Sequence, residues 1–302
     1  MRMELEIRAL EGDNFDFIRK DFDFVKHQIK VEFSPKKWMI EKPGRTVLFD
    51  GKNQYLYMQT SDYVIKGGAN TGFVEWLHIL LSPDKILEAE QQRAKKEEAN
   101  YTIEETENQL ILTSFASAKG DYTNDYLKNT SVTSSDNKRI FCFDKESHQL
   151  RSFELYIIDN QEEILMMKTT DIKYDETFDP QDFSVKKFGN KEIKDIKQLE
   201  PKADKELINK TPKEVAFYFF NACAKNDWKS AKKVAPFPYH PFLKPYFSDL
   251  EIIEIGEAFQ SGTYPGYFVP YTVKLKSGDI KQNNLGLRND NSEGMWQIDG
   301  GL

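Results

Sequence analysis

The sequence predicts a fold that is mainly β plus α+β: an unclosed β-barrel, or half-barrel, with a helical insert, and then helices on a curved antiparallel sheet. Three observations lead to this fold class. Short segments that alternate apolar and polar residues recur from Met1 to about Lys187. The chain has 22 Phe and 14 Tyr, residues that favour strands. Its 302 residues exceed one average domain and suit two.

The first predicted domain, residues 1–187, is a meander of strands curved into a half-barrel. Met1 to Leu10 alternates apolar and charged residues, the pattern of a half-buried strand and not of a signal peptide. Asp50-Gly51-Lys52 is a tight-turn signal between two strands, Thr46 to Phe49 and Gln54 to Gln59. We expect later strands at Arg139 to Phe143, Leu150 to Ile158 and Ile164 to Tyr174.

A helical insert interrupts the strands. Ser82 is a suitable N-cap, Pro83 fits the first helical position, and the helix is predicted to continue to Glu98. Its many charged residues, spaced three or four apart, are typical of a solvated helix face. The alternative is a helix that docks a partner.

Residues 188–209 are polar and predict a linker, which leaves 210–302 as a small second domain. Thr211-Pro212-Lys213-Glu214 is a capping box that starts a helix. A second short helix is predicted after Asp227, a loop over Pro236 to Pro245, and then an antiparallel meander. Two helices on a curved sheet form an α+β cone.

Composition and residue spacing exclude several classes of function. The net charge of −7 does not suit nucleic-acid binding, which needs clustered Lys and Arg. The two cysteines, Cys142 and Cys223, lack metal-ligand or redox spacing and are expected to be free and buried. The four histidines are scattered, so neither a metal site nor a cofactor is predicted: His27, His78, His148 and His240.

The first domain resembles the outer-membrane lipoprotein carrier (LolA) family and the related sensor domain that regulates an envelope-stress anti-sigma factor. Two stretches carry the resemblance. They contain Pro35, Trp38-Met39-Ile40, Pro43, Arg45, Leu48-Phe49-Asp50-Gly51-Lys52 and Tyr55-Leu56-Tyr57, and then Thr170-Asp171-Ile172-Lys173-Tyr174, Phe178-Asp179-Pro180 and Phe183. The sequence departs from the carriers before Pro35, where Ser34 stands in place of an arginine involved in gating.

This resemblance implies a helical lid over an apolar interior that accepts acyl chains. Five large side chains are candidates for one concave ligand-binding surface: Trp38, Tyr57, Phe141, Phe153 and Met166. The alternative is that these residues fill an ordinary core.

The second domain looks like the NTF2-like cone, from Thr211 through Asn226-Asp227-Trp228 to the sheet that ends at Gly300. That fold hosts enzymes, ligand binders and dimerisation modules, so it implies no function by itself. An enzyme would need acid and base groups inside the cone, and His240 and Asp299 have no convincing partner in the sequence.

The sequence therefore predicts a non-enzymatic protein of the cell envelope or periplasm. Its β domain would bind a lipid or a lipidated segment, and its small domain would dock an envelope protein. A membrane-anchored regulator that uses both domains for protein contacts is the first alternative, with a leader or anchor upstream of Met1. An enzyme of the NTF2-like class is the second.

Overall fold

The protein divides into two compact units, Met1–Lys194 and Asp195–Leu302, which we treat separately. The computed structural model describes residues 1–9, 18–59, 61–96, 99–118, 132, 135–199, 204–235, 240–261, 264–291 and 293–302. Within that part of the chain, no helix is both long and apolar enough to cross a membrane.

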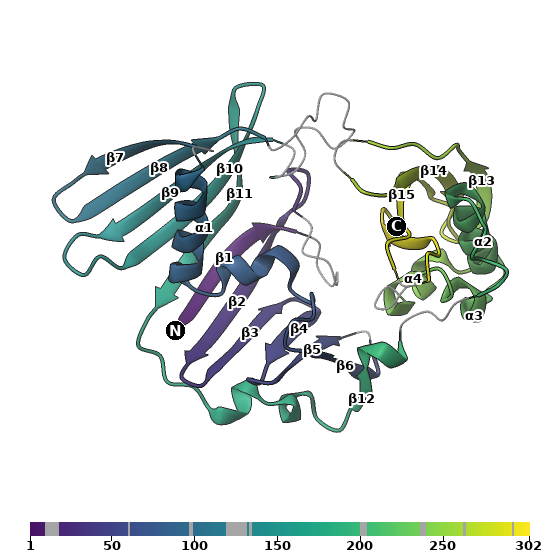
Figure 1. Ribbon diagram of the computed structural model, residues 1–302, viewed down its shortest axis with the longest axis horizontal. Helices are drawn as coiled ribbons and strands as arrows, with labels where there is room; N and C mark the ends of the chain where they lie inside the picture. The colour runs from purple at the N-terminus through teal and green to yellow at the C-terminus, as the bar shows by residue number, and fades with distance from the viewer. Residues whose placement is uncertain are drawn as a thin grey trace. The chain divides into compact units, whose positions relative to one another are not determined.

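The first unit is built on one curved, unclosed sheet of 12 strands (Figure 1). The strands are β1 Arg2–Arg8, β2 Phe24–Phe33, β3 Lys36–Lys42, β4 Arg45–Phe49, β5 Asn53–Met58, β6 Tyr63–Gly68, β7 Asn100–Glu105, β8 Gln109–Ala116, β9 Asp136–Asp144, β10 Leu150–Asp159, β11 Glu162–Lys173 and β12 Glu192–Asp195. Their order is β12-β6-β5-β4-β3-β2-β1-β11-β10-β9-β8-β7. From β6 to β7 every neighbouring pair is antiparallel. The predicted half-barrel is confirmed.

The two faces of this sheet differ in chemistry because side chains alternate along each strand. In β1, Met3, Leu5 and Ile7 are buried on what we call the inner face. The residues between them point to the outer face, where Glu4 pairs with Lys26 at 2.7 Å and Glu6 pairs with Lys168 at 3.0 Å. At β1 the inner face is therefore apolar and the outer face is charged.

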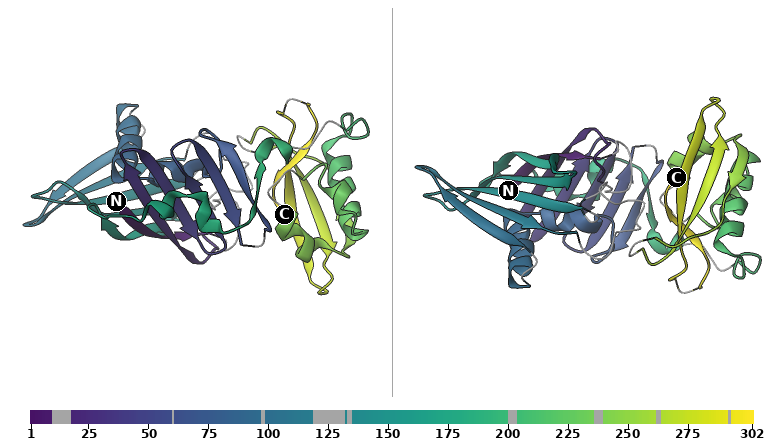
Figure 2. Two further views of the ribbon diagram at one scale, coloured as in Figure 1. Left: turned by 90° about the horizontal axis from the view of Figure 1, so that it is seen from below. Right: turned by 90° about the horizontal axis from the view of Figure 1, so that it is seen from above.

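Each face has its own cover (Figure 2). The 3-10 helix η1 (Glu75–Leu80) and helix α1 (Pro83–Lys95) lie within the curve of the sheet. Ser82 caps α1 by accepting a hydrogen bond from the Lys85 N–H, as the sequence predicts. The outer face of β3–β6 packs against the 3-10 helices η2 (Pro180–Phe183) and η3 (Val185–Phe188). This packing forms a cluster of Met39, Leu48, Tyr55, Val64, Phe183 and Phe188.

The stretch expected to be a linker, 188–209, contains regular structure. The strand β12 pairs beside β6 at the edge of the large sheet, and the 3-10 helix η4 (Ile196–Gln198) follows it. Leu207 is fully buried. An edge strand can be polar on both faces, because much of it stays in contact with water, so its composition resembles that of a loop.

The second unit has a four-stranded antiparallel sheet in the order β13-β14-β15-β16, with three helices. Its elements are α2 Pro212–Ala224, α3 Trp228–Ala231, α4 His240–Phe247, β13 Glu251–Ile255, β14 Tyr267–Lys274, β15 Ile280–Arg288 and β16 Gln297–Gly300. The capping box of Thr211 and Glu214 is confirmed: the Thr211 N–H donates to the Glu214 carboxylate at 2.7 Å. Phe219, Phe220 and Tyr271 form the centre of its core.

The loop predicted over Pro236 to Pro245 is wrong in its second half, because α4 begins at His240. Proline is tolerated in the first turn of a helix, where the missing N–H would have no partner, so Pro241 does not prevent α4 from starting. Residues 236–239 and the side chain of His240 lie outside the described part of the chain.

Candidate functional site

Four of the five predicted ligand-binding residues lie on the inner face of the first unit. Phe141 and Phe153 face each other across β9 and β10, with ring centroids 5.0 Å apart. Trp38 stacks on Phe49 with centroids 5.7 Å apart. Met166 is the extra residue of a β-bulge, between Leu165 and Met167 of β11, and is fully buried. The strands therefore place these four side chains on the same face of the sheet, although β2, β1, β11 and β10 separate β3 from β9.

Tyr57 lies on the other face. It pairs with Thr46, and Thr46 pairs with Glu41, which is three residues from Trp38 and so points to the opposite side of the sheet. Its ring packs against Phe188 of η3 at a centroid distance of 5.1 Å. The expectation that all five residues share one concave surface is therefore wrong for Tyr57.

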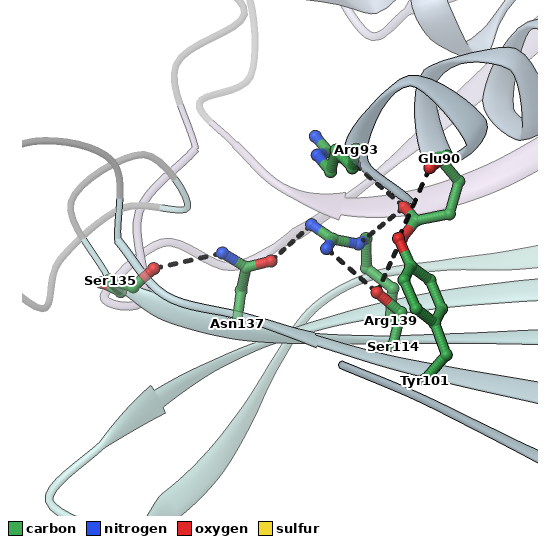
Figure 3. A network of polar contacts seen from close by, with 7 residues as sticks. All are labelled: Glu90, Arg93, Tyr101, Ser114, Ser135, Asn137 and Arg139. Atoms are coloured by element: carbon green, nitrogen blue, oxygen red, sulfur yellow. Dashed lines mark hydrogen bonds and ion pairs between the residues drawn. The ribbon is translucent and has the colours of Figure 1, made fainter. Parts of the chain in front are cut away.

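A buried polar network joins α1 to the sheet (Figure 3). The Glu90 carboxylate of α1 accepts hydrogen bonds from the Ser114 hydroxyl at 2.6 Å and from the Tyr101 hydroxyl at 3.0 Å. It forms ion pairs with Arg139 of β9 and with Arg93 of its own helix, both at 3.0 Å. Four side chains thus contact the Glu90 carboxylate.

Arg139 extends the network along the sheet. Its guanidinium donates to the Asn137 side-chain oxygen at 2.5 Å and to the Ser114 hydroxyl at 3.1 Å. The exposed fractions of the Glu90 and Arg139 side chains are only 5% and 4%. Burial lowers the pKa of Arg139, and the Glu90 charge opposes that shift. Burial and Glu90 both raise the pKa of Tyr101, which keeps the phenol protonated as a donor.

The charge pattern of α1 predicts a solvated helix, so it does not identify Glu90 or its partner Arg139. A weak signal was present. Glu90 follows Ile86 by four residues, so both occupy the same helix face, and that face is the buried one. A carboxylate in line with the apolar residues of an amphipathic helix points toward a partner in the core.

Helix α1 attaches to the inner face with little apolar contact. Among its 13 residues, the buried ones are Pro83, Ile86 and Glu90. Ile86 is the one large aliphatic side chain of the helix that is fully buried, and Leu87 is half-buried. The Glu90–Arg139 network therefore supplies much of what holds the helix in place.

A second group of basic side chains lies on the inner face, toward β4. His27 of β2, Lys42 of β3 and Arg45 of β4 are all buried. The Arg45 guanidinium donates to the main-chain oxygen of Phe73, at the approach to η1. His27 Nδ1 is 3.0 Å from the Val25 oxygen. Burial lowers the pKa of His27 to about 4, helped by the charges of Lys42 and Arg45, so the imidazole is neutral near pH 7.

Apolar side chains separate the two polar groups. The cross-strand row that begins with Ser114 and Arg139 continues through Leu155, Met167 and Ile7. The next row brings Leu5 opposite His27. The inner face is thus an apolar floor with a polar cluster at either side.

In the second unit, we describe fewer contacts among side chains that could bind a ligand or act on one. Asp299 accepts a hydrogen bond from the Tyr264 hydroxyl at 3.0 Å and lies 4.0 Å from Arg288. Burial raises the pKa of the Cys223 thiol to about 12, which leaves it protonated, and Cys142 is half-buried on β9. In the described parts of both units, no group of three His, Cys, Asp or Glu side chains could hold a metal ion.

Comparison with known proteins adds little to these observations. No family model matches the chain, and no curated protein has significant sequence similarity to it. An uncharacterized conserved protein from Thermus thermophilus is similar in structure with a TM-score of 0.33 and 5% identity, over 64% of this chain and 88% of that one. A putative outer membrane lipoprotein-sorting protein domain from Vibrio parahaemolyticus has a TM-score of 0.25 and 13% identity, over 61% and 87%. At these TM-scores neither likeness supports an argument about function.

The Glu90–Arg139 pair can be tested by a double-mutant cycle. Glu90→Leu and Arg139→Met should each lower the free energy of unfolding by about 3–5 kcal/mol, because each leaves a buried group without its partner. The double variant should lose less than the sum of the two, with a coupling of about 2 kcal/mol. Urea denaturation of wild type, the two single variants and the double variant measures the four free energies of unfolding.

The control for this cycle is the exposed pair of Lys85 and Glu88 on the same helix. Its coupling should be about 0.5 kcal/mol or less, as for other solvent-exposed pairs three residues apart. Equal coupling energies in the two cycles would mean that Glu90 is not a buried anchor.

The buried His27 should make stability depend on pH. Its pKa is about 4 in the fold and about 6.5 in an unfolded chain, so between those values the unfolded state binds more protons. The stabilisation is complete above pH 6.5 and is lost as the pH falls toward 4, by at most about 1.4 kcal/mol per pH unit.

His27→Phe should remove that slope from the pH dependence of the urea midpoint. His148→Asn, at an exposed turn with φ of 56°, should keep it. A slope that is the same in wild type and His27→Phe would show that another group causes it.

Proposed function

We propose that the first unit binds an apolar ligand, a lipid or a lipidated segment, on its inner face, with α1 as a displaceable cover. The protein acts in the cell envelope without catalysing a reaction, and the second unit serves as an interaction module.

The observation that carries this proposal is the attachment of α1. The helix lies over the inner face, but Ile86 is its one fully buried large aliphatic side chain and contributes about 1.5–3 kcal/mol, while Leu87 is only half-buried. An acyl chain gains about 0.8 kcal/mol for each CH2 group that leaves water. A dozen such groups would contribute about 10 kcal/mol, enough to offset the loss of the helix contacts.

The arrangement of polar groups favours an amphiphile over a plain hydrocarbon. The apolar floor of Leu155, Met167 and Ile7 lies between the Glu90–Arg139 network and the His27, Lys42 and Arg45 group. A ligand with a long apolar part and a polar end would leave water along the floor and keep its polar end beside one of these groups.

Binding is a better account of this face than catalysis. The polar side chains around Glu90 serve each other: Ser114, Tyr101 and Arg139 all satisfy the Glu90 carboxylate. A general acid or base would need to present a proton to a substrate, whereas these groups hold two elements of the fold together.

Placement in the cell envelope rests on the sequence resemblance to the lipoprotein carriers. For the second unit, the NTF2-like resemblance allows a docking role. The exposed apolar side chains of Phe217 on α2 and Ile253 on β13, each about half exposed, support that role.

The proposal is tested by titrating the whole protein with a fluorescent fatty-acyl probe. Wild type should bind it. Met167→Trp should weaken binding at least tenfold while keeping the urea midpoint, since a larger side chain occupies the space of the ligand. Trp38→Ala should also weaken binding. Tyr57→Ala is the matched control on the outer face and should bind like wild type.

A filled core would behave differently. Wild type would not bind the probe, Met167→Trp would be destabilised by overpacking, and Trp38→Ala would lose about 3–5 kcal/mol of stability. That result would exclude lipid binding on the inner face.

A further inference from the structure

Among the strands of the described residues, β7 is an edge of the large sheet. It is the last strand in the order, after β8, whereas at the opposite edge the chain itself supplies β12 to cover β6. Five of its six residues are exposed, and Ile103 in its middle has 73% of its surface exposed. An edge strand of this kind presents main-chain N–H and C=O groups that another strand can pair with.

The charged residues of this strand and of the turn that follows it have one sign. Between Asn100 and Gln109 the sequence has three glutamates, Glu104, Glu105 and Glu107, and neither Lys nor Arg. Lys145 pairs with Glu105 at 2.6 Å. Glu104 and Glu107 leave a net negative charge at the edge of the strand.

The strand is held in an extended conformation before any partner arrives. It pairs with β8 over its whole length, from Asn100 opposite Phe115 to Glu105 opposite Leu110. The Tyr101 hydroxyl fixes it further by donating to Glu90 at 3.0 Å. Because the strand is already ordered, binding a partner would cost less conformational entropy.

We propose that β7 accepts an added strand from an extended, basic segment of a partner protein. Main-chain hydrogen bonds along about 20 Å of strand would provide affinity. Lys or Arg side chains of the partner would lie near Glu104 and Glu107, and an apolar side chain would cover Ile103. A second copy of this chain fits less well, because its own three glutamates would repel those of β7.

This proposal stands independently of lipid binding, and its test needs no lipid. The probe is a fluorescein-labelled peptide that alternates lysine with valine, compared with one that alternates glutamate with valine. The protein should bind the basic peptide at least tenfold more tightly than the acidic peptide at low ionic strength. Binding should slow hydrogen exchange of β7 amides at least tenfold, which attraction between charges alone would not do.

The variant Glu104→Lys/Glu107→Lys should weaken peptide binding at least tenfold. Asp62→Lys/Glu162→Lys makes the same change of net charge at two other exposed positions and should bind like wild type. Absent binding, binding without protection of β7, or equal losses in the two variants would overturn the proposal. So would self-association, seen by sedimentation and abolished by Ile103→Lys, because β7 would then pair with a second copy.

Discussion

The position of α1 depends on one buried ion pair, Glu90 with Arg139, and the proposed function depends on the position of α1. Two charges taken out of water cost several kcal/mol each, which their mutual attraction and surrounding hydrogen bonds only offset. Ser114 and Tyr101 supply those hydrogen bonds. The pair therefore fixes where the helix sits without adding much stability, unlike an apolar interface that would hold the helix firmly.

The rest of the first unit follows from how the two faces of its sheet are covered. Ion pairs such as Glu4 with Lys26 leave the outer face of β1 and β2 in water, and η2 and η3 cover the outer face of β3–β6. Apolar side chains also line the inner face. Because the sheet does not close, that face needs a separate cover. The cover is apolar in η1, where Leu77 and Leu80 are buried, and largely polar in α1. One part of the cover is thus anchored firmly and the other is attached by few groups.

Much of this fold could be predicted from local sequence patterns, and the failures have physical reasons. Alternation identifies β1, and the caps at Ser82 and Thr211 mark helix starts, because both signals depend on adjacent residues. The face on which Tyr57 lies depends on cross-strand register, which alternation within one strand does not determine. The burial of Glu90 depends on Arg139, 49 positions away in the chain. The edge strand β12 has no apolar pattern to reveal it.

The most direct test of this account is native-state hydrogen exchange of the whole protein at increasing urea concentrations. If α1 is a displaceable cover, its amides exchange through a local opening, at a free energy well below that of β1 and β10. That opening depends less on urea than global unfolding does, because it exposes only a small part of the surface that the fold buries. If α1 amides share the free energy and urea dependence of β1 and β10, the helix opens only with global unfolding, and the account is contradicted.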